Sequence, residues 1–92
     1  MKVLLVEDEP SVAGIINKGL TENKYEVSIA PDGVVGLQMA SANPFDVIIL
    51  DVMLPGMNGM EVCRRLRASK NQTPILFLTA LGTTENIVAG LE

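Results

Sequence analysis

Aromatic side chains, cysteine and histidine are scarce in this sequence of 92 residues. Phe, Tyr and Trp together make up 3% of it, there is no histidine, and Cys63 is the single cysteine. Because hydrophobic residues still make up 48%, the core must be built from Leu, Ile, Val, Met and Ala. A lone cysteine cannot form an internal disulfide, which fits a protein from a reducing compartment. The length is enough for one small domain.

Long apolar runs and an excess of positive charge are also absent. No stretch approaches the roughly 20 apolar residues that a membrane-spanning helix needs. The first apolar run has four residues, Val3–Val6, and continues directly into Glu7-Asp8-Glu9, which makes it too short and too acidic for a signal peptide. The net charge of -4 argues against a nucleic-acid-binding surface. We therefore expect a folded cytoplasmic domain that contacts neither a membrane nor nucleic acid directly.

Short apolar runs alternate with segments in which apolar residues recur at helical spacing. The first run lacks the alternation of a half-exposed strand, as expected of a strand that is buried on both faces. Pro10 suits the first turn of a helix, where its missing N–H would have no partner anyway. In chain order the sequence predicts strand Lys2–Val6, helix Pro10–Leu20, strand Tyr25–Ala30, helix Val34–Ser41, strand Asp46–Leu50, helix Met60–Ser69, strand Ile75–Leu78 and helix Glu85–Glu92.

Strands that alternate with helices in this way indicate right-handed βαβ units. The fold class is therefore α/β, with a doubly wound parallel sheet that carries helices on both faces. Ligands of such sheets bind at the carboxyl ends of the strands. In this sequence those ends carry Glu7-Asp8, Ala30, Asp51 and Thr79.

Two of the apolar strands end in acidic residues. Because the carboxyl ends of parallel strands meet at one edge of a sheet, we expect Glu7, Asp8 and Asp51 to lie close together. Their mutual repulsion would raise the pKa of at least one of them unless a cation lies between them. Mg²⁺ prefers oxygen ligands of this kind. A carboxylate beside Mg²⁺ can attack phosphorus and form an aspartyl-phosphate.

Each of these residues also has an ordinary explanation when it is considered alone. Asp51 would serve as a turn residue, and acids before Pro10 would stabilise a helix N-terminus through its dipole. Thr79 would hydrogen-bond its own backbone at the end of a strand. The combination of acids on two strands favours the metal site.

Three blocks of the sequence resemble the receiver domain of two-component response regulators. They are VLLVEDEP from Val3 to Pro10, DVIILDVMLPGMNG from Asp46 to Gly59 and PILFLTA from Pro74 to Ala80, in the order and spacing of that family. The resemblance implies a flavodoxin-like fold, Mg²⁺ as the cofactor and a histidine kinase as the partner. It also implies a role in phosphorelay signal transduction, not the activity of a stand-alone enzyme.

The resemblance further implies a role for each residue of the site. Asp51 corresponds to the phospho-acceptor, Thr79 to the switch hydroxyl, and Ala80 to a residue whose backbone N–H binds the phosphoryl group. The implied metal ligands are Glu7, Asp8, Asp51 and the backbone carbonyl of Met53.

The end of the sequence departs from the family pattern. Receiver domains continue through a fifth strand and a fifth helix, and the lysine and the switch aromatic of that fifth strand have no match here. We therefore expect residues 1–92 to form a single truncated receiver domain that ends within its fourth helix, with strand order 2-1-3-4 and impaired phosphorylation. The apolar edge Ile75–Leu78 and one uncovered face of the sheet should then promote self-association.

Two other functions share part of this pattern. A phosphohydrolase that forms an aspartyl-phosphate usually carries a second acid two residues after the nucleophile, but position 53 is Met. A flavodoxin-like cofactor binder needs a phosphate loop after the first strand, where Glu7-Asp8-Glu9 would repel phosphate. Residues 54–67 are similar to regulators with a winged-helix DNA-binding domain, so we expect the parent protein to be a transcriptional regulator.

Overall fold

Strands and helices alternate along the whole described part of the chain. The computed structural model describes residues 1–78, so Thr79, Ala80 and the helix expected at Glu85–Glu92 lie outside the described residues. The elements are β1 (Lys2–Val6), α1 (Pro10–Glu22), β2 (Glu26–Ala30), α2 (Gly33–Ala42), β3 (Val47–Asp51), α3 (Gly59–Ala68) and β4 (Ile75–Leu78). Every element predicted within these residues is present, and the ends differ from the prediction by at most two residues.

The strands form one parallel sheet in the order β2-β1-β3-β4. The class α/β and the strand order 2-1-3-4 are therefore confirmed. In the register of the sheet, Val6 is paired with Ala30 on one side and with Leu50 on the other. Asp51 is paired with Leu78. The carboxyl ends of neighbouring strands are thus level with one another.

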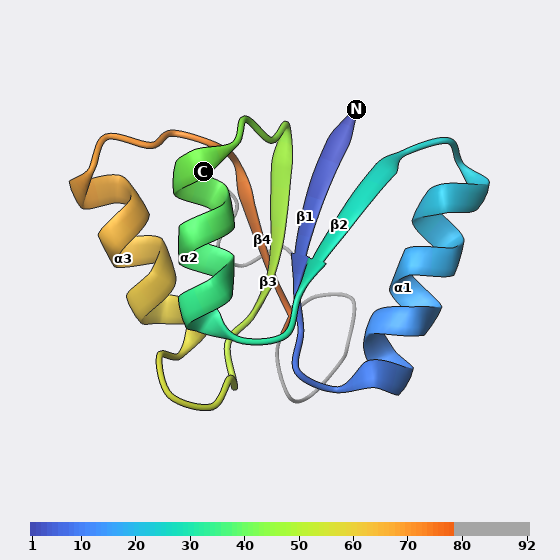
Figure 1. Ribbon diagram of the computed structural model, residues 1–92, viewed down its shortest axis with the longest axis horizontal. Coiled ribbons are helices and arrows are strands. Elements are labelled where there is room, and N and C mark those ends of the chain that lie inside the picture. Colours follow the sequence, from blue (N-terminus) through green and yellow to red (C-terminus); the bar gives the residue numbers. More distant parts are fainter. Residues whose placement is uncertain (79–92) are drawn as a thin grey trace.

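Helices cover both faces of the sheet, as predicted for a doubly wound fold. Figure 1 shows α1 on one side of the strands and α2 and α3 together on the other. On the side of α2 and α3, the main core consists of Leu4, Val6, Ala30, Ala40, Ile48, Leu50, Leu54, Val62, Leu66, Ile75 and Phe77. Since side chains alternate along a strand, Val3 and Leu5 point to the other face, where they are also buried. Ile49 and Leu76, which share that face, are only half-buried.

The start of each helix is determined by its local sequence. Asp32 caps α2 by accepting a hydrogen bond from the Val35 N–H at 2.8 Å, and Asn58 caps α3 in the same way. These caps satisfy N–H groups that have no partner within the helix. α1 has no such side-chain cap and begins with Pro10 instead. None of the helices within residues 1–78 is both long enough and apolar enough to cross a membrane.

Candidate metal centre

Three carboxylates meet at the carboxyl ends of β1 and β3. Glu7 and Asp8 directly follow β1, and Asp51 is the last residue of β3. Because β1 and β3 are neighbours in the sheet, each of these residues has a carboxylate oxygen within 4.8 Å of those of the other two. The prediction that these acids lie close together is confirmed.

The three carboxylates differ in their environments. Glu7 is only 6% exposed, Asp51 is half-buried and Asp8 is exposed. Burial raises the pKa of Glu7 to about 7, and the neighbouring carboxylates of Asp51 and Asp8 add to this increase. A hydrogen bond of 3.0 Å from the Glu9 N–H to the Glu7 carboxylate opposes it in part. Ionising all three acids together is therefore costly.

No basic side chain balances this negative charge within residues 1–78. The ion pairs in this part of the chain join Glu61 to Arg64 and Arg65 on the exposed face of α3. A cluster of carboxylate oxygens without a basic partner suits a hard divalent cation, which takes oxygen ligands and removes the repulsion. The donor set therefore fits Mg²⁺.

The loop of residues 52–58 connects Asp51 to α3 and is held in place at several points. The Val52 carbonyl accepts hydrogen bonds from the Leu54 and Gly59 N–H groups, at 3.2 and 3.0 Å. The Leu54 side chain is 8% exposed and belongs to the core. The Met53 N–H donates to Asp51 Oδ1 at 3.1 Å, which orients the carboxylate. Met53 thus lies beside the acidic cluster, while the role of its carbonyl as a metal ligand stays a prediction.

Glycines near the site were not identified as functional from the sequence. A Cβ atom at Gly59 would lie 2.2 Å from the Asp51 carbonyl oxygen, and one at Gly33 would lie 2.1 Å from the Met57 carbonyl oxygen. Both glycines directly follow a capping residue, Asp32 or Asn58, in the sequence. Asp-Gly and Asn-Gly pairs indicate a turn, but they give no sign that another part of the chain packs so closely.

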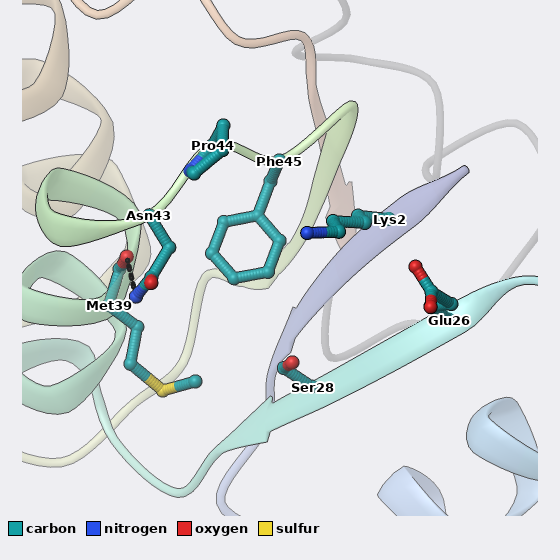
Figure 2. A pocket seen from close by; sticks show the side chains of 7 residues that line it. All are labelled: Lys2, Glu26, Ser28, Met39, Asn43, Pro44 and Phe45. Carbon is teal, nitrogen blue, oxygen red and sulfur yellow. Dashed lines mark hydrogen bonds between the residues drawn. The ribbon is translucent and has the colours of Figure 1, made fainter.

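The pocket in Figure 2 lies at the opposite end of the sheet from the acidic cluster. It has a volume of about 310 Å³, and Lys2 and Glu26, which begin β1 and β2, help to line it. None of the predicted site residues lines it. Another hollow, of about 290 Å³, opens beside Glu7 and Asp8, and its other walls are formed by Pro10, Ala13, Gly14, Ile29 and Pro31. The second hollow reaches Glu7 and Asp8 from the side of α1, and Asp51 is not part of its walls.

Comparison with known proteins identifies the family. The pattern of the family described as the response regulator receiver domain matches residues 3–92. The chain belongs to this receiver domain family. The flavodoxin-like fold implied by the resemblance is confirmed, and the family match decides against the phosphohydrolase and the flavodoxin-like cofactor binder.

Curated relatives of this receiver domain are considerably longer than the chain. The chain is 48% identical over 92 residues to the transcriptional regulatory protein CusR from Escherichia coli K12. This alignment covers 100% of the chain and 40% of CusR. The chain is 48% identical over 90 residues to the response regulator ArlR from Staphylococcus epidermidis, covering 98% of this chain and 41% of that protein. The chain therefore spans about 40% of the length of these relatives.

Solved receiver structures have the same fold. The receiver domain of the Francisella response regulator 1452 superimposes with a TM-score of 0.85 at 35% identity, over 97% of this chain and 74% of that chain. The response regulator TrrA from Thermotoga maritima, solved in complex with Mg(2+)-BeF, gives a TM-score of 0.82 at 34% identity, over 86% of this chain and 69% of that one. The absence of a fifth strand and a fifth helix from this protein stays a prediction.

Proposed function

We propose that this receiver domain accepts a phosphoryl group on Asp51 in a reaction that depends on Mg²⁺, and that a histidine kinase donates it. The cluster of Glu7, Asp8 and Asp51, whose carboxylate oxygens lie within 4.8 Å of one another, carries this proposal. The protein then acts in signal transduction and is not a stand-alone enzyme.

Burial and hydrogen bonding favour Asp51 over the other two acids as the acceptor. Glu7 is buried, with only 6% of its surface exposed, so a phosphoryl donor has little access to its carboxylate. Asp51 is half-buried. The Met53 N–H donates to its Oδ1 and orients the carboxylate, which also interacts with the carboxyl group of Glu7. An oxygen of this oriented carboxylate is then placed to attack a phosphorus atom in line.

The transfer itself requires one bond to form and one to break. An Asp51 carboxylate oxygen forms a new bond to phosphorus while the P–N bond of a phosphohistidine breaks. The electron pair of that bond stays on the imidazole nitrogen, which takes up a proton.

Glu7, Asp8, Asp51 and the backbone carbonyl of Met53 are the groups that would hold Mg²⁺, one of the acids through a water molecule. When bound, the ion supplies positive charge that screens the carboxylates and the oxygens of the phosphoryl group. The pKa of Glu7 is raised mainly by burial, but the negative charges of Asp51 and Asp8 add to the increase, and a cation would offset that part. The complex of the Thermotoga maritima protein with Mg(2+)-BeF also supports it.

Thr79 and Ala80 are proposed to act on the phosphoryl group after transfer. β4 ends at Leu78, which is paired with Asp51. Thr79 and Ala80 come next in the sequence. The Thr79 hydroxyl would hydrogen-bond a phosphoryl oxygen, and the Ala80 backbone N–H would bind another. In this role Thr79 acts as the switch that reports phosphorylation to the rest of the protein.

The parent protein is proposed to be a cytoplasmic transcriptional regulator, because CusR is named as one and its receiver part is similar to this chain. Residues 1–92 would form its truncated receiver domain and would not contact nucleic acid directly.

Self-association through β4 is part of the proposal. β4 is an edge strand of the sheet formed by residues 1–78, and an apolar edge can pair with a second copy of the chain. We expect an oligomer in sedimentation velocity at micromolar protein, and Leu76→Lys, which places a charge on the half-buried face of β4, should shift it to monomer. A sharp monomer peak for the unaltered chain would refute this part of the proposal.

Intact-mass spectrometry tests the acceptor directly. The chain is incubated with Mg²⁺ and acetyl phosphate, and we expect a slow gain of one phosphoryl group, because the lysine of the family's fifth strand has no match here. Asp51→Asn should abolish the gain. Asp46→Asn is the matched control, since Asp46 lies before β3, at the opposite end of that strand, where it accepts a hydrogen bond from the Lys2 N–H. A gain that persists in Asp51→Asn would contradict the assignment.

A further inference from the structure

Helix α2 approaches β1 and the loop that follows β3, and glycines make the close approach possible. A Cβ atom at Gly36 would lie 2.8 and 2.9 Å from the two methyl carbons of Val6 on β1. A Cβ atom at Gly33 would lie 2.1 Å from the Met57 carbonyl oxygen in the loop of residues 52–58. Both distances are shorter than van der Waals contact, so a larger residue at Gly33 would displace α2 or the Met57 backbone, and one at Gly36 would displace α2 or the Val6 side chain.

The two contacts belong to the two halves of the metal centre. Val6 directly precedes Glu7 and Asp8, whereas Met57 belongs to the loop that begins after Asp51 and contains Met53. One half follows β1 and the other follows β3, and α2 touches the end of β1 and the loop after β3.

The loop of residues 52–58 has little room to move between its neighbours. On one side Gly59 packs against the Asp51 carbonyl, so closely that a Cβ there would lie 2.2 Å from it. On the other side the Met57 carbonyl oxygen lies 2.1 Å from the position that a Cβ atom at Gly33 would take. No N–H group within residues 1–78 donates to that carbonyl. The start of α2 therefore determines how far the loop extends from the strand ends.

We propose that α2 is a brace that sets the spacing between the two halves of the metal centre, with Gly33 and Gly36 as positioning residues. This inference depends on the proposed Mg²⁺ site. Mg²⁺ requires a nearly ideal octahedron with ligands at about 2.0–2.1 Å, whereas Ca²⁺ accepts longer and less regular geometries. A displaced loop therefore weakens the binding of Mg²⁺ more than the binding of Ca²⁺.

The ratio of the two affinities distinguishes positioning from a loss of stability. A variant that is only less stable has a smaller folded fraction, and this lowers its apparent affinity for both ions by the same factor. The ratio of Mg²⁺ to Ca²⁺ affinity then stays unchanged. A variant in which the site is distorted changes that ratio.

Calorimetric titration of the full chain with MgCl₂ and CaCl₂ tests the brace. For Gly33→Ala we expect the ratio of Mg²⁺ to Ca²⁺ affinity to fall about tenfold, as for other changes that support metal ligands indirectly. Gly19→Ala is the matched control, because a Cβ atom at Gly19 on α1 meets nothing within 4 Å. It should leave the ratio unchanged.

A folded Gly33→Ala variant with the ratio of the unaltered chain would overturn the brace. If circular dichroism shows that this variant does not fold, Gly36→Ala decides instead, because its added methyl meets the Val6 side chain and not a backbone atom. Gly36→Ala should lower the ratio, and adding Val6→Ala should restore it. An unchanged ratio in Gly36→Ala overturns the brace, whereas failure of the unaltered chain to bind Mg²⁺ overturns the proposed metal site itself.

Discussion

The two faces of the sheet are packed to very different degrees. Under α2 and α3, Leu50 and Ile75 are 0% exposed and Ile48 is 1% exposed. On the side of α1, Val3 and Leu5 of the central strand are buried, but Ile29 at the edge of the sheet is 42% exposed and Ile15 on the helix itself is 74% exposed. One face thus forms the closed core that supports the loop after Asp51. The other contributes less to stability and leaves the acidic cluster accessible.

The largest expected loss of stability concerns two isoleucines that lie on opposite faces of β3. Ile48 and Ile49 are neighbours on β3, but Ile48 points into the main core and Ile49 is half-buried on the other face. Ile48→Ala should lower the free energy of unfolding by about 3 kcal/mol, since it leaves a cavity in a closed core. Ile49→Ala should cost about 1 kcal/mol, because its side chain is only partly removed from water.

Urea unfolding of the two variants measures this difference. Equal losses of stability would contradict the comparison of the two faces. As a control for the fold, both variants should have the same circular dichroism spectrum as the unaltered chain.

Glu7 should make the stability of the metal-free protein depend on pH. Its pKa of about 7 lies above the ordinary value of 4.5, so the folded state binds more protons than the unfolded state between these pH values. The free energy of unfolding therefore decreases as the pH rises from about 4.5 to about 7. Because the cluster is open to solvent at Asp8, we expect a loss of roughly 1–2 kcal/mol, less than the full shift implies.

Urea unfolding at pH 5 and pH 7.5 in the presence of a chelator checks the sign. Glu7→Gln, which cannot ionise, should remove most of the difference. Stability that instead rises with pH in the unaltered chain would show that another group dominates the titration.

The smallest expected effect concerns the helix caps, which also differ between the faces. Asp32 accepts a hydrogen bond from the Val35 N–H at the start of α2, so Asp32→Ala should cost about 1 kcal/mol. Glu9 precedes α1 without forming a side-chain cap, and Glu9→Ala should change stability by less than about 0.5 kcal/mol. Thermal unfolding measures the stability of both variants. An equal loss of stability in Asp32→Ala and Glu9→Ala would contradict the expected difference between the helix caps.

Much of the fold is predictable from local sequence. Continuous apolar runs identify β1 and β3, since strands buried on both faces show no alternation. The meeting of Glu7, Asp8 and Asp51 follows from the level carboxyl ends of parallel strands. The strand order, in contrast, came from the resemblance to a family, because nothing in the runs themselves says which strands are neighbours.

Other features depend on contacts between distant segments and could not be predicted. Glu7 and Asp8 are adjacent acids, yet one is buried and the other exposed, and this difference depends on the packing around the end of β1. The approach of Gly33 to Met57 joins residues from separate βαβ units, and only the packing of α2 against the loop reveals it. Helices α2 and α3 begin one residue earlier than predicted, because Asp32 and Asn58 are caps followed by glycine.

The central position of β1 in the sheet has a consequence for how the protein folds during synthesis. β1 is made first, but its partners β2 and β3 begin at residues 26 and 47, so it cannot complete its hydrogen bonds as it leaves the ribosome. Such long-range pairing is slow compared with local contacts. The acids of β1 and β3 meet only after β3 has docked, so Mg²⁺ binding should report native topology and remain absent from collapsed intermediates.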